Sequence, residues 1–151
     1  MVMDNKLIGT DTTQYIVVKM GVEQYGIDIK YVDNIVRMQK ITRVPKAQKW
    51  FDGVINLRGE IIPVMNLRRK FELEEVENTD KTRIIVLKPD NQGSIGVIVD
   101  RVKEVVTLGS ESIEKAQTDM KDEKSKYISS VGKQGDELIT ILNINGVLDI
   151  N

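Results

Sequence analysis

The residue types that most often perform chemistry in proteins are missing from this chain. It has no cysteine and no histidine, which removes thiolate nucleophiles, thiolate metal ligands and the usual general base. The sequence holds neither a Gly-rich phosphate-binding loop nor a Gly-x-Ser-x-Gly nucleophile turn. An enzyme would have to work with carboxylates alone. We therefore expect a non-catalytic protein that needs no cofactor and no metal.

The remaining candidates for chemistry are carboxylates in polar segments. Glu74 and Glu75 are neighbours in an acidic stretch that reads as a surface loop, without the apolar setting that would separate the pKa values of an acid and a base. Asp119, Asp122 and Glu123 offer only oxygen ligands and lack the spacing of an EF-hand. Both groups are typical of solvated loops, so binding through the surface becomes the leading class of function.

One local charge asymmetry suggests an alternative function. Five cations precede Trp50 and Phe51 within residues 37–50: Arg37, Lys40, Arg43, Lys46 and Lys49. Such a stretch is able to contact a phosphate backbone while the aromatic rings stack on bases. The whole chain, however, has 22 basic and 23 acidic residues, which favours a solvated loop over a nucleic-acid site. A small nucleic-acid-binding β-barrel stays open as the alternative.

The composition points to a mainly β protein. Val and Ile together make 37 of the 151 residues, against 9 Leu, and branching at Cβ suits the pleated sheet. No apolar run approaches the roughly 20 residues of a membrane span, and the first residues do not resemble a signal peptide. We expect a cytoplasmic protein that does not insert into the membrane.

Apolar runs separated by Gly, Asp and Lys predict a series of short strands. They lie at residues 15–20, 25–29, 53–57, 60–66, 83–88, 95–100, 128–131 and 137–144. Pro63 inside one run predicts an edge position or a bulge. Residues 108–118 predict a short helix with Ser110 as its N-cap.

Three of these blocks recur in the same order, which indicates a duplication. Residues 15–19 match 84–88, residues 26–36 match 96–106, and residues 60–67 match 137–144. The sequence therefore predicts a loose tail over 1–13 and one domain over 14–151. We expect that domain to contain two small β units, at about 14–71 and 83–148, joined by an acidic linker over 72–80.

Residues 53–67 predict a β-hairpin with the turn Leu57-Arg58-Gly59-Glu60 at its tip. Gly59 supplies any positive φ that the turn needs. Arg58 is then exposed, where its guanidinium is a good anchor for a carboxylate. The corresponding turn of the repeat is read as residues 133–136, which contain no arginine, so the turn itself does not require Arg58.

These segments resemble the CheW family of chemotaxis coupling proteins. The resemblance rests on residues 56–59 with Pro63, on residues 25–29 followed by Val32, Ile35 and Val44-Pro45, and on residues 96–100 followed by Val102 and Val105. It extends in order over residues 14–149. It implies an all-β fold of two duplicated, five-stranded SH3-like barrels packed together.

The resemblance also implies a function and its partners. CheW-like proteins are adaptors that link the cytoplasmic tips of transmembrane chemoreceptors to the regulatory domain of the histidine kinase CheA. We therefore expect a cytoplasmic signal-transduction scaffold recruited to receptor arrays, without a nucleic-acid partner.

Site residues follow from the same resemblance. It implies a receptor-facing groove formed by Ile29, Val32, Ile35, Val102 and Val105. It implies that Arg58 supports coupling, and that Gly53 and Gly96 stand where a larger side chain is hard to place. Asn34 stands where some relatives carry a glutamate, so the resemblance carries no polar contact over to this position. The spacing of the groove residues also fits core positions on a short helical turn, so exposure and burial both stay open.

Overall fold

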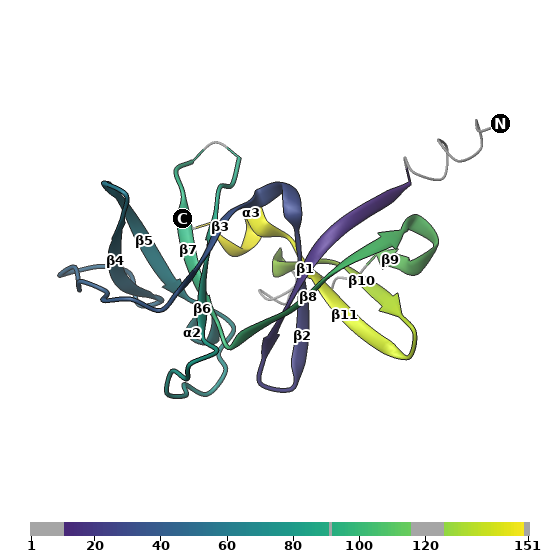
Figure 1. Cartoon of the computed structure of the whole chain (residues 1–151), viewed down its shortest axis with the longest axis horizontal. Helices are drawn as coiled ribbons and strands as arrows, with labels where there is room; N and C mark the ends of the chain where they lie inside the picture. The colour runs from purple at the N-terminus through teal and green to yellow at the C-terminus, as the bar shows by residue number, and fades with distance from the viewer. Residues whose placement is uncertain (1–10, 91, 116–125, 150–151) are drawn as a thin grey trace.

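The computed structural model describes residues 11–90, 92–115 and 126–149, and most of them lie in strands. The expected all-β fold is confirmed. Two curled sheets lie side by side, one on each side of the short helix α3 (Figure 1). No helix of the described residues is long and apolar enough to cross a membrane.

The first sheet has six strands in the order β8-β1-β2-β11-β10-β9. Its strands are β1 (Thr12–Met20), β2 (Glu23–Asp28), β8 (Arg101–Gly109), β9 (Ile113–Lys115), β10 (Ile128–Gln134) and β11 (Glu137–Leu142). The second sheet has five strands in the order β3-β6-β7-β5-β4. Its strands are β3 (Val32–Arg37), β4 (Phe51–Leu57), β5 (Glu60–Asn66), β6 (Arg83–Leu87) and β7 (Ile95–Val99).

Short helical turns lie between the strands and after the last one: η1 (Ile29–Tyr31), α2 (Leu67–Lys70), η2 (Ser110–Ser112) and α3 (Ile144–Val147). The helix expected over 108–118 is wrong within its described part. There β8 runs to Gly109 and η2 follows, without a side-chain cap at its start. Strand β9 then pairs with β10, so sheet pairing satisfies the backbone that we expected a helix to satisfy.

Strands β3 and β8 were not among the predicted strands. Their apolar residues recur at spacings of three and four, which suggested a helical turn, and that interpretation is wrong. Strand β8 pairs with β1 along its length and β3 pairs with β6. In β8 the exposed Val105 is followed by the buried Val106, the alternation that a strand produces.

The two sheets exchange strands between the repeats. Strands β1 and β2, from the unit expected over 14–71, lie in one sheet with β8 to β11, whereas β6 and β7 lie in one sheet with β3 to β5. This composition differs from two consecutive barrels. The exchange places β1 and β6 in the interior of their sheets, where their uninterrupted Val and Ile runs are buried on both faces.

Residues that are equivalent in the sequence repeat also have equivalent partners in the strand pairing. Gly26 lies opposite Val17 and Ile141, and Gly96 lies opposite the corresponding Val86 and Val64. The equivalent caps also agree: Asn66 Oδ1 accepts from the backbone N–H of Arg69 at 3.1 Å, and Asn143 Oδ1 accepts from that of Gly146 at 3.2 Å. The two sheets are therefore built to one plan, as the duplication predicted.

The largest apolar cluster fills the space between the sheets, and we call it the junction cluster. It contains Ile16, Val18, Met20, Ile27, Met65, Leu67, Phe71, Ile85, Leu87, Ile95, Val97, Val99, Leu142, Ile144, Val147 and Leu148. Tyr15 and Val17, on the other face of β1, belong to a second cluster inside the six-stranded sheet. A third cluster fills the five-stranded sheet.

Pro63 is at neither an edge nor a bulge, because β5 lies between β7 and β4. Its partner Val54 turns its backbone N–H and C=O toward Thr42, in two hydrogen bonds of 2.8 Å. Pairing of β5 with β7 begins only at Val64. The missing N–H of proline therefore removes no bond from either neighbouring strand.

Candidate protein-binding site

The expected groove residues come from two equivalent segments of the repeat. Ile29 lies in η1, and Val32 and Ile35 lie in β3. Val102 and Val105 occupy the matching places in β8. Strands β3 and β8 are also at matching edges of their sheets, and within the described residues each pairs with one strand only. The site therefore combines apolar side chains with unpaired strand edges.

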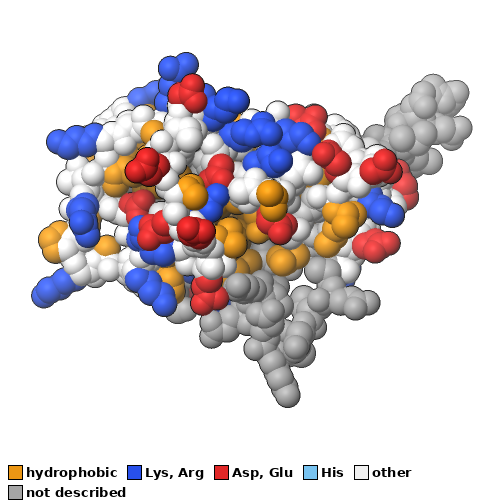
Figure 2. Space-filling model, turned by 90° about the horizontal axis from the view of Figure 1, so that it is seen from below, with side chains coloured by type: hydrophobic (Ala, Val, Ile, Leu, Met, Phe, Trp, Pro, Cys, Tyr) orange, Lys and Arg blue, Asp and Glu red, His pale blue; other side chains and the backbone are white. Residues whose placement is uncertain are grey.

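Some of these five residues are exposed, as a binding surface requires, and others are partly buried, as core positions would be. Val32 and Val102 are half-buried and pack against the junction cluster. Ile29, Ile35 and Val105 are exposed, at 39%, 38% and 52% of their surface. Exposed β-branched side chains beside a buried apolar layer are typical of a surface that another protein covers. Seen from below, hydrophobic side chains also reach the surface in the middle of the molecule (Figure 2).

Arg58 lies apart from this site, at the tip of the β4–β5 hairpin, as the sequence predicts. Strand β4 is the edge of its sheet opposite β3, and Figure 1 shows this hairpin far from the junction. Arg58 is exposed, and its side chain contacts no described residue through a hydrogen bond or ion pair. Its guanidinium is free to meet a partner's carboxylate.

The backbone at the tip has a positive φ at Arg58 as well as at Gly59, and the sequence did not predict the first of these. Arg58 has a φ of 55° and Gly59 a φ of 86°, the two positive values of a type I′ turn. The pairing of Leu57 with Glu60 and of Gln134 with Glu137 aligns Arg58 with Gly135, one residue later than the sequence comparison suggested. Gly135 has a φ of 61°. Arginine thus stands in a left-handed conformation that favours glycine.

Gly53 and Gly96 are buried and present no surface to a partner. Gly53 has a φ of 147°, and a Cβ there would collide with the carbonyl of Thr42. A Cβ on Gly96 would lie 2.8 Å from Ile84 Cγ2. Gly53 thus lets residues 38–50 lie against β4, and Gly96 lets β6 and β7 pack closely.

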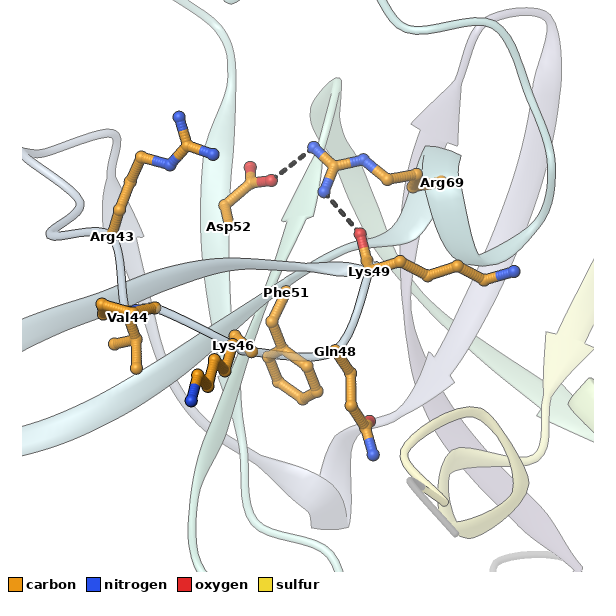
Figure 3. A pocket seen from close by; sticks show the side chains of 10 residues that line it. Arg43, Val44, Lys46, Gln48, Lys49, Phe51, Asp52 and Arg69 are labelled. Atoms are coloured by element: carbon orange, nitrogen blue, oxygen red, sulfur yellow. Dashed lines mark hydrogen bonds and ion pairs between the residues drawn. The ribbon is translucent and has the colours of Figure 1, made fainter.

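The basic stretch forms a loop over a hollow of about 650 Å³. Arg43, Lys46 and Lys49 point to three different sides of it (Figure 3). Arg69 is held by the Lys49 carbonyl at 2.7 Å and by Asp52 at 2.6 Å. The cations therefore do not converge on one phosphate.

The aromatic residues of that stretch are also unavailable for stacking on bases. The Lys70 ammonium lies 4.0 Å from the ring centroid of Trp50, and Trp50 packs against the junction cluster. Phe51 is half-buried at the start of β4. These positions match the solvated-loop interpretation and give no support to the nucleic-acid alternative.

One polar network at the junction was not predicted. Arg68 Nη2 and Nε donate to Asp100 at 2.5 and 3.1 Å, and the Gly21 N–H donates to the same carboxylate at 2.6 Å. Burial alone would raise the pKa of Asp100, but these hydrogen bonds lower it overall. The network ties the β1–β2 turn to α2 and to the corner before β8. Its members lie far apart in sequence, so no local pattern reveals it.

A second polar contact at the junction is made by Lys70, which is buried. Its Nζ donates to the Asp149 carbonyl at 3.2 Å, and burial lowers its pKa. Beside it, an apolar pocket of about 130 Å³ opens between Tyr25, Phe71 and Tyr127. Both features bring chain segments from the two sheets together.

Within the described residues, no group of His, Cys, Asp and Glu is arranged to hold a metal ion. Asp119, Asp122 and Glu123 lie outside the described residues. Glu74 and Glu75 are exposed, and Glu75 forms an ion pair with Arg69 at 3.1 Å.

Comparison with known proteins identifies the family. The model of the CheW-like domain matches residues 14–151. Chemotaxis protein CheW of Bacillus subtilis is 37% identical over 134 residues, 89% of this chain and 85% of that protein. Chemotaxis protein CheW of Klebsiella aerogenes is 32% identical, covering 95% of this chain and 87% of that protein.

A solved structure agrees with these relatives. The crystal structure of scaffolding protein TtCheW from Thermoanaerobacter tengcongensis is similar with a TM-score of 0.81 and 31% identity, over 92% of this chain and 94% of that one. With a family model that matches nearly the whole chain and relatives of this identity, the chain belongs to the CheW-like family of chemotaxis scaffold proteins.

Proposed function

We propose that this chain is a non-catalytic adaptor that couples transmembrane chemoreceptors to the histidine kinase CheA. It binds the cytoplasmic tips of the receptors and the regulatory domain of the kinase, and it works in the cytoplasm at membrane receptor arrays. The proposal assigns no reaction to the chain, because adaptors of this family act by holding partners together.

The observation that carries the proposal is the apolar surface at the sheet junction of a CheW-like chain. Ile29, Ile35 and Val105 are exposed there beside the half-buried Val32 and Val102. We assign this surface to the receptor. Burying such side chains under a partner contributes about 25 cal/mol for each Å² of apolar area removed from water.

Arg58 supplies a second contact. Its exposed guanidinium on the outer hairpin is separated from the junction surface by the width of the five-stranded sheet. An adaptor needs at least two surfaces that do not overlap, and this separation provides them. We assign Arg58 to assembly of the receptor–adaptor–kinase complex. Gly53 and Gly96 act indirectly, by shaping the strands beside these surfaces.

The test is a binding assay with a purified receptor cytoplasmic fragment and, separately, the kinase regulatory domain. Val105→Asp places a charge on the junction surface and should weaken receptor binding about tenfold or more. Val22→Asp is the matched control, because Val22 is 90% exposed in the β1–β2 turn. It should bind like the wild type, and both variants should melt at the wild-type temperature.

Failure of the wild-type chain to bind either partner would refute the proposed function. Equal receptor binding by Val105→Asp and the wild type would remove the junction surface from the site. Binding to single-stranded nucleic acid that falls steeply with salt would instead favour the alternative.

A further inference from the structure

A basic hollow lies directly beside the proposed receptor site. It has a volume of about 340 Å³ and is lined by Lys81, Arg83, Arg101 and Val102. Three of these four residues are cations and none is an acid. Val102 belongs to the junction surface, so the hollow and the apolar site share a wall.

The strand register brings further positive charge to the same place. Arg37 lies directly opposite Arg83 in the β3–β6 pair, and Lys19 lies directly opposite Arg101 in the β1–β8 pair. Opposed side chains of like charge destabilise a sheet. Two such pairs at one junction are a cost that the fold alone does not explain.

Little in the described part of the chain offsets this charge. Arg83 donates only to backbone carbonyls, of Asp80 at 2.8 Å and Thr82 at 2.9 Å. Neither Lys81 nor Arg101 forms an ion pair with a described residue. Asp100, the acid next to Arg101, is occupied by Arg68.

Lys19 is the exception among these cations. The pKa of Glu137 is lowered mainly by Lys103 and to a smaller extent by Lys19, so Lys19 has an acid within reach. The uncompensated charge is therefore concentrated on Arg37, Lys81, Arg83 and Arg101. Lys and Arg side chains also gather along the upper edge of the face in Figure 2.

We infer that the basic hollow receives an acidic segment of the protein that covers Val32 and Val102. This inference rests on the proposed function and names the chemistry of that partner: carboxylates beside apolar side chains. Arg83 and Arg101 bind the carboxylates, since guanidinium groups match them in bidentate geometry. Covering the hollow also relieves the repulsion of the like-charged pairs.

The observations favour a protein over a phosphate polymer or a lipid surface. The hollow has three cations and the apolar Val102 in its lining, whereas a nucleic acid is bound by a longer row of cations. The chain has a net charge of −1, so it has no overall field to attract a polyanion or an anionic membrane.

The test measures the affinity of the full chain for a receptor cytoplasmic fragment from the same organism, at low and at high salt. Lys81→Glu and Arg101→Glu should each weaken binding about tenfold, and the salt dependence should become shallower. Lys133→Glu is the matched control: it makes the same charge change on the exposed β10–β11 hairpin and should bind like the wild type.

Arg101→Gln separates binding from folding. It removes a like-charge pair, so its Tm should equal or exceed that of the wild type by about 1–2 °C while its affinity falls. A lower Tm together with unchanged affinity would give Arg101 a structural role and overturn the inference.

The remaining outcomes are distinguishable. Receptor binding that is equal in the wild type, Lys81→Glu and Arg101→Glu would overturn this inference and leave the proposed function standing. No receptor or kinase binding by the wild type would overturn both. Retention on phosphatidylglycerol vesicles that Arg101→Glu abolishes, with receptor binding unchanged, would assign the hollow to the membrane and overturn the inference.

Discussion

The two hairpins β4–β5 and β10–β11 have the same place in the repeat but different turns. Arg58 and Gly59 form the first turn, both with positive φ, whereas Gly135 and Asp136 form the second, with positive φ at Gly135 alone. Glycine adopts this conformation at little cost and arginine at about 1–2 kcal/mol. The fold needs the turn, and it does not need the arginine. A strained, exposed and unpartnered residue is a reason to look for function at the first tip.

The two sides of the junction differ in a similar way. Arg68, two residues after the Asn66 cap, binds the Asp100 carboxylate that also accepts from Gly21. Asn145, two residues after the Asn143 cap, accepts from the Asp90 N–H at 3.2 Å. One repeat thus joins an arginine to a carboxylate, whereas the other joins the Asn145 amide to the backbone N–H and the carboxylate of Asp90. The duplication therefore preserved the register of the backbone and let the side chains specialise.

The largest effect should come from Gly53, which the repeat replaces with Ser130 at the paired position. Gly53→Ala should cost about 3 kcal/mol or more, because the new Cβ collides with the Thr42 carbonyl at a φ of 147°. Ser130→Ala should cost less than about 1 kcal/mol, since Ser130 has no positive φ. Urea unfolding of both variants checks the difference. Similar losses would mean that the two strands are packed alike.

The next effect concerns the charged side of the junction. Asp100→Asn should cost about 1–2 kcal/mol near neutral pH, with the partial exposure of the pair already discounted. The pKa of Asp100 is lower in the folded chain than its ordinary value of 3.8. Its contribution is therefore present above pH 3.8 and is lost as the pH falls through the folded-state pKa.

The measurement is the free energy of unfolding of both proteins from pH 7 down to pH 3. The advantage of the wild type over Asp100→Asn should shrink as the pH falls below 3.8, so that the two curves approach each other at the acidic end. Curves that stay parallel would assign the acid sensitivity to other carboxylates and make the Arg68–Asp100 contact a weak surface pair.

The sequence predicts most of this architecture because the strands are strongly apolar. The hairpin of residues 53–67, the exposed Arg58 and the repeat register all follow from local patterns. The exchange of β1 and β2 between sheets does not, because pairing partners of similar Val and Ile runs are chosen by tertiary packing. Strand β3 was missed for a related reason: partly buried apolar residues at spacings of three and four fit helix and strand alike.

Contacts across the junction were equally hidden. Gly21 and Asp100 are separated by 79 residues, and a turn glycine beside a lone aspartate gives no signal in a single sequence. The basic hollow was hidden too, since Lys81, Arg83 and Arg101 meet only when β6 and β8 are placed. The sequence drew attention instead to residues 37–50, where a cation recurs at every third position, but Arg43, Lys46 and Lys49 point to different sides.

A smaller effect, with opposite signs in the two repeats, should appear at the hairpin tips. Arg58→Gly should raise stability by about 0.5–1 kcal/mol by relieving the left-handed arginine, and Gly135→Ala should lower it by a similar amount. Thermal melts measure both. In a reconstituted complex Arg58→Gly should lose kinase activation, and Arg58→Lys should keep only part of it. Full activation by the glycine variant would leave Arg58 with neither a structural nor a binding role.

The smallest change in stability should come from Ile35 and Val105, the exposed residues at equivalent positions of β3 and β8. Ile35→Thr and Val105→Thr keep branching at Cβ, so each should change the unfolding free energy by no more than about 0.5 kcal/mol. If a partner covers both strands, each substitution should weaken receptor binding, and the double variant should lose about the product of the two factors. Loss at only one position would mean that the partner contacts a single repeat, and that the symmetry of the strands is not reflected in the binding surface. Titration calorimetry of the wild type, both single variants and the double variant measures the affinities that distinguish these cases. Unchanged melting temperatures of the variants exclude unfolding as the cause of any loss.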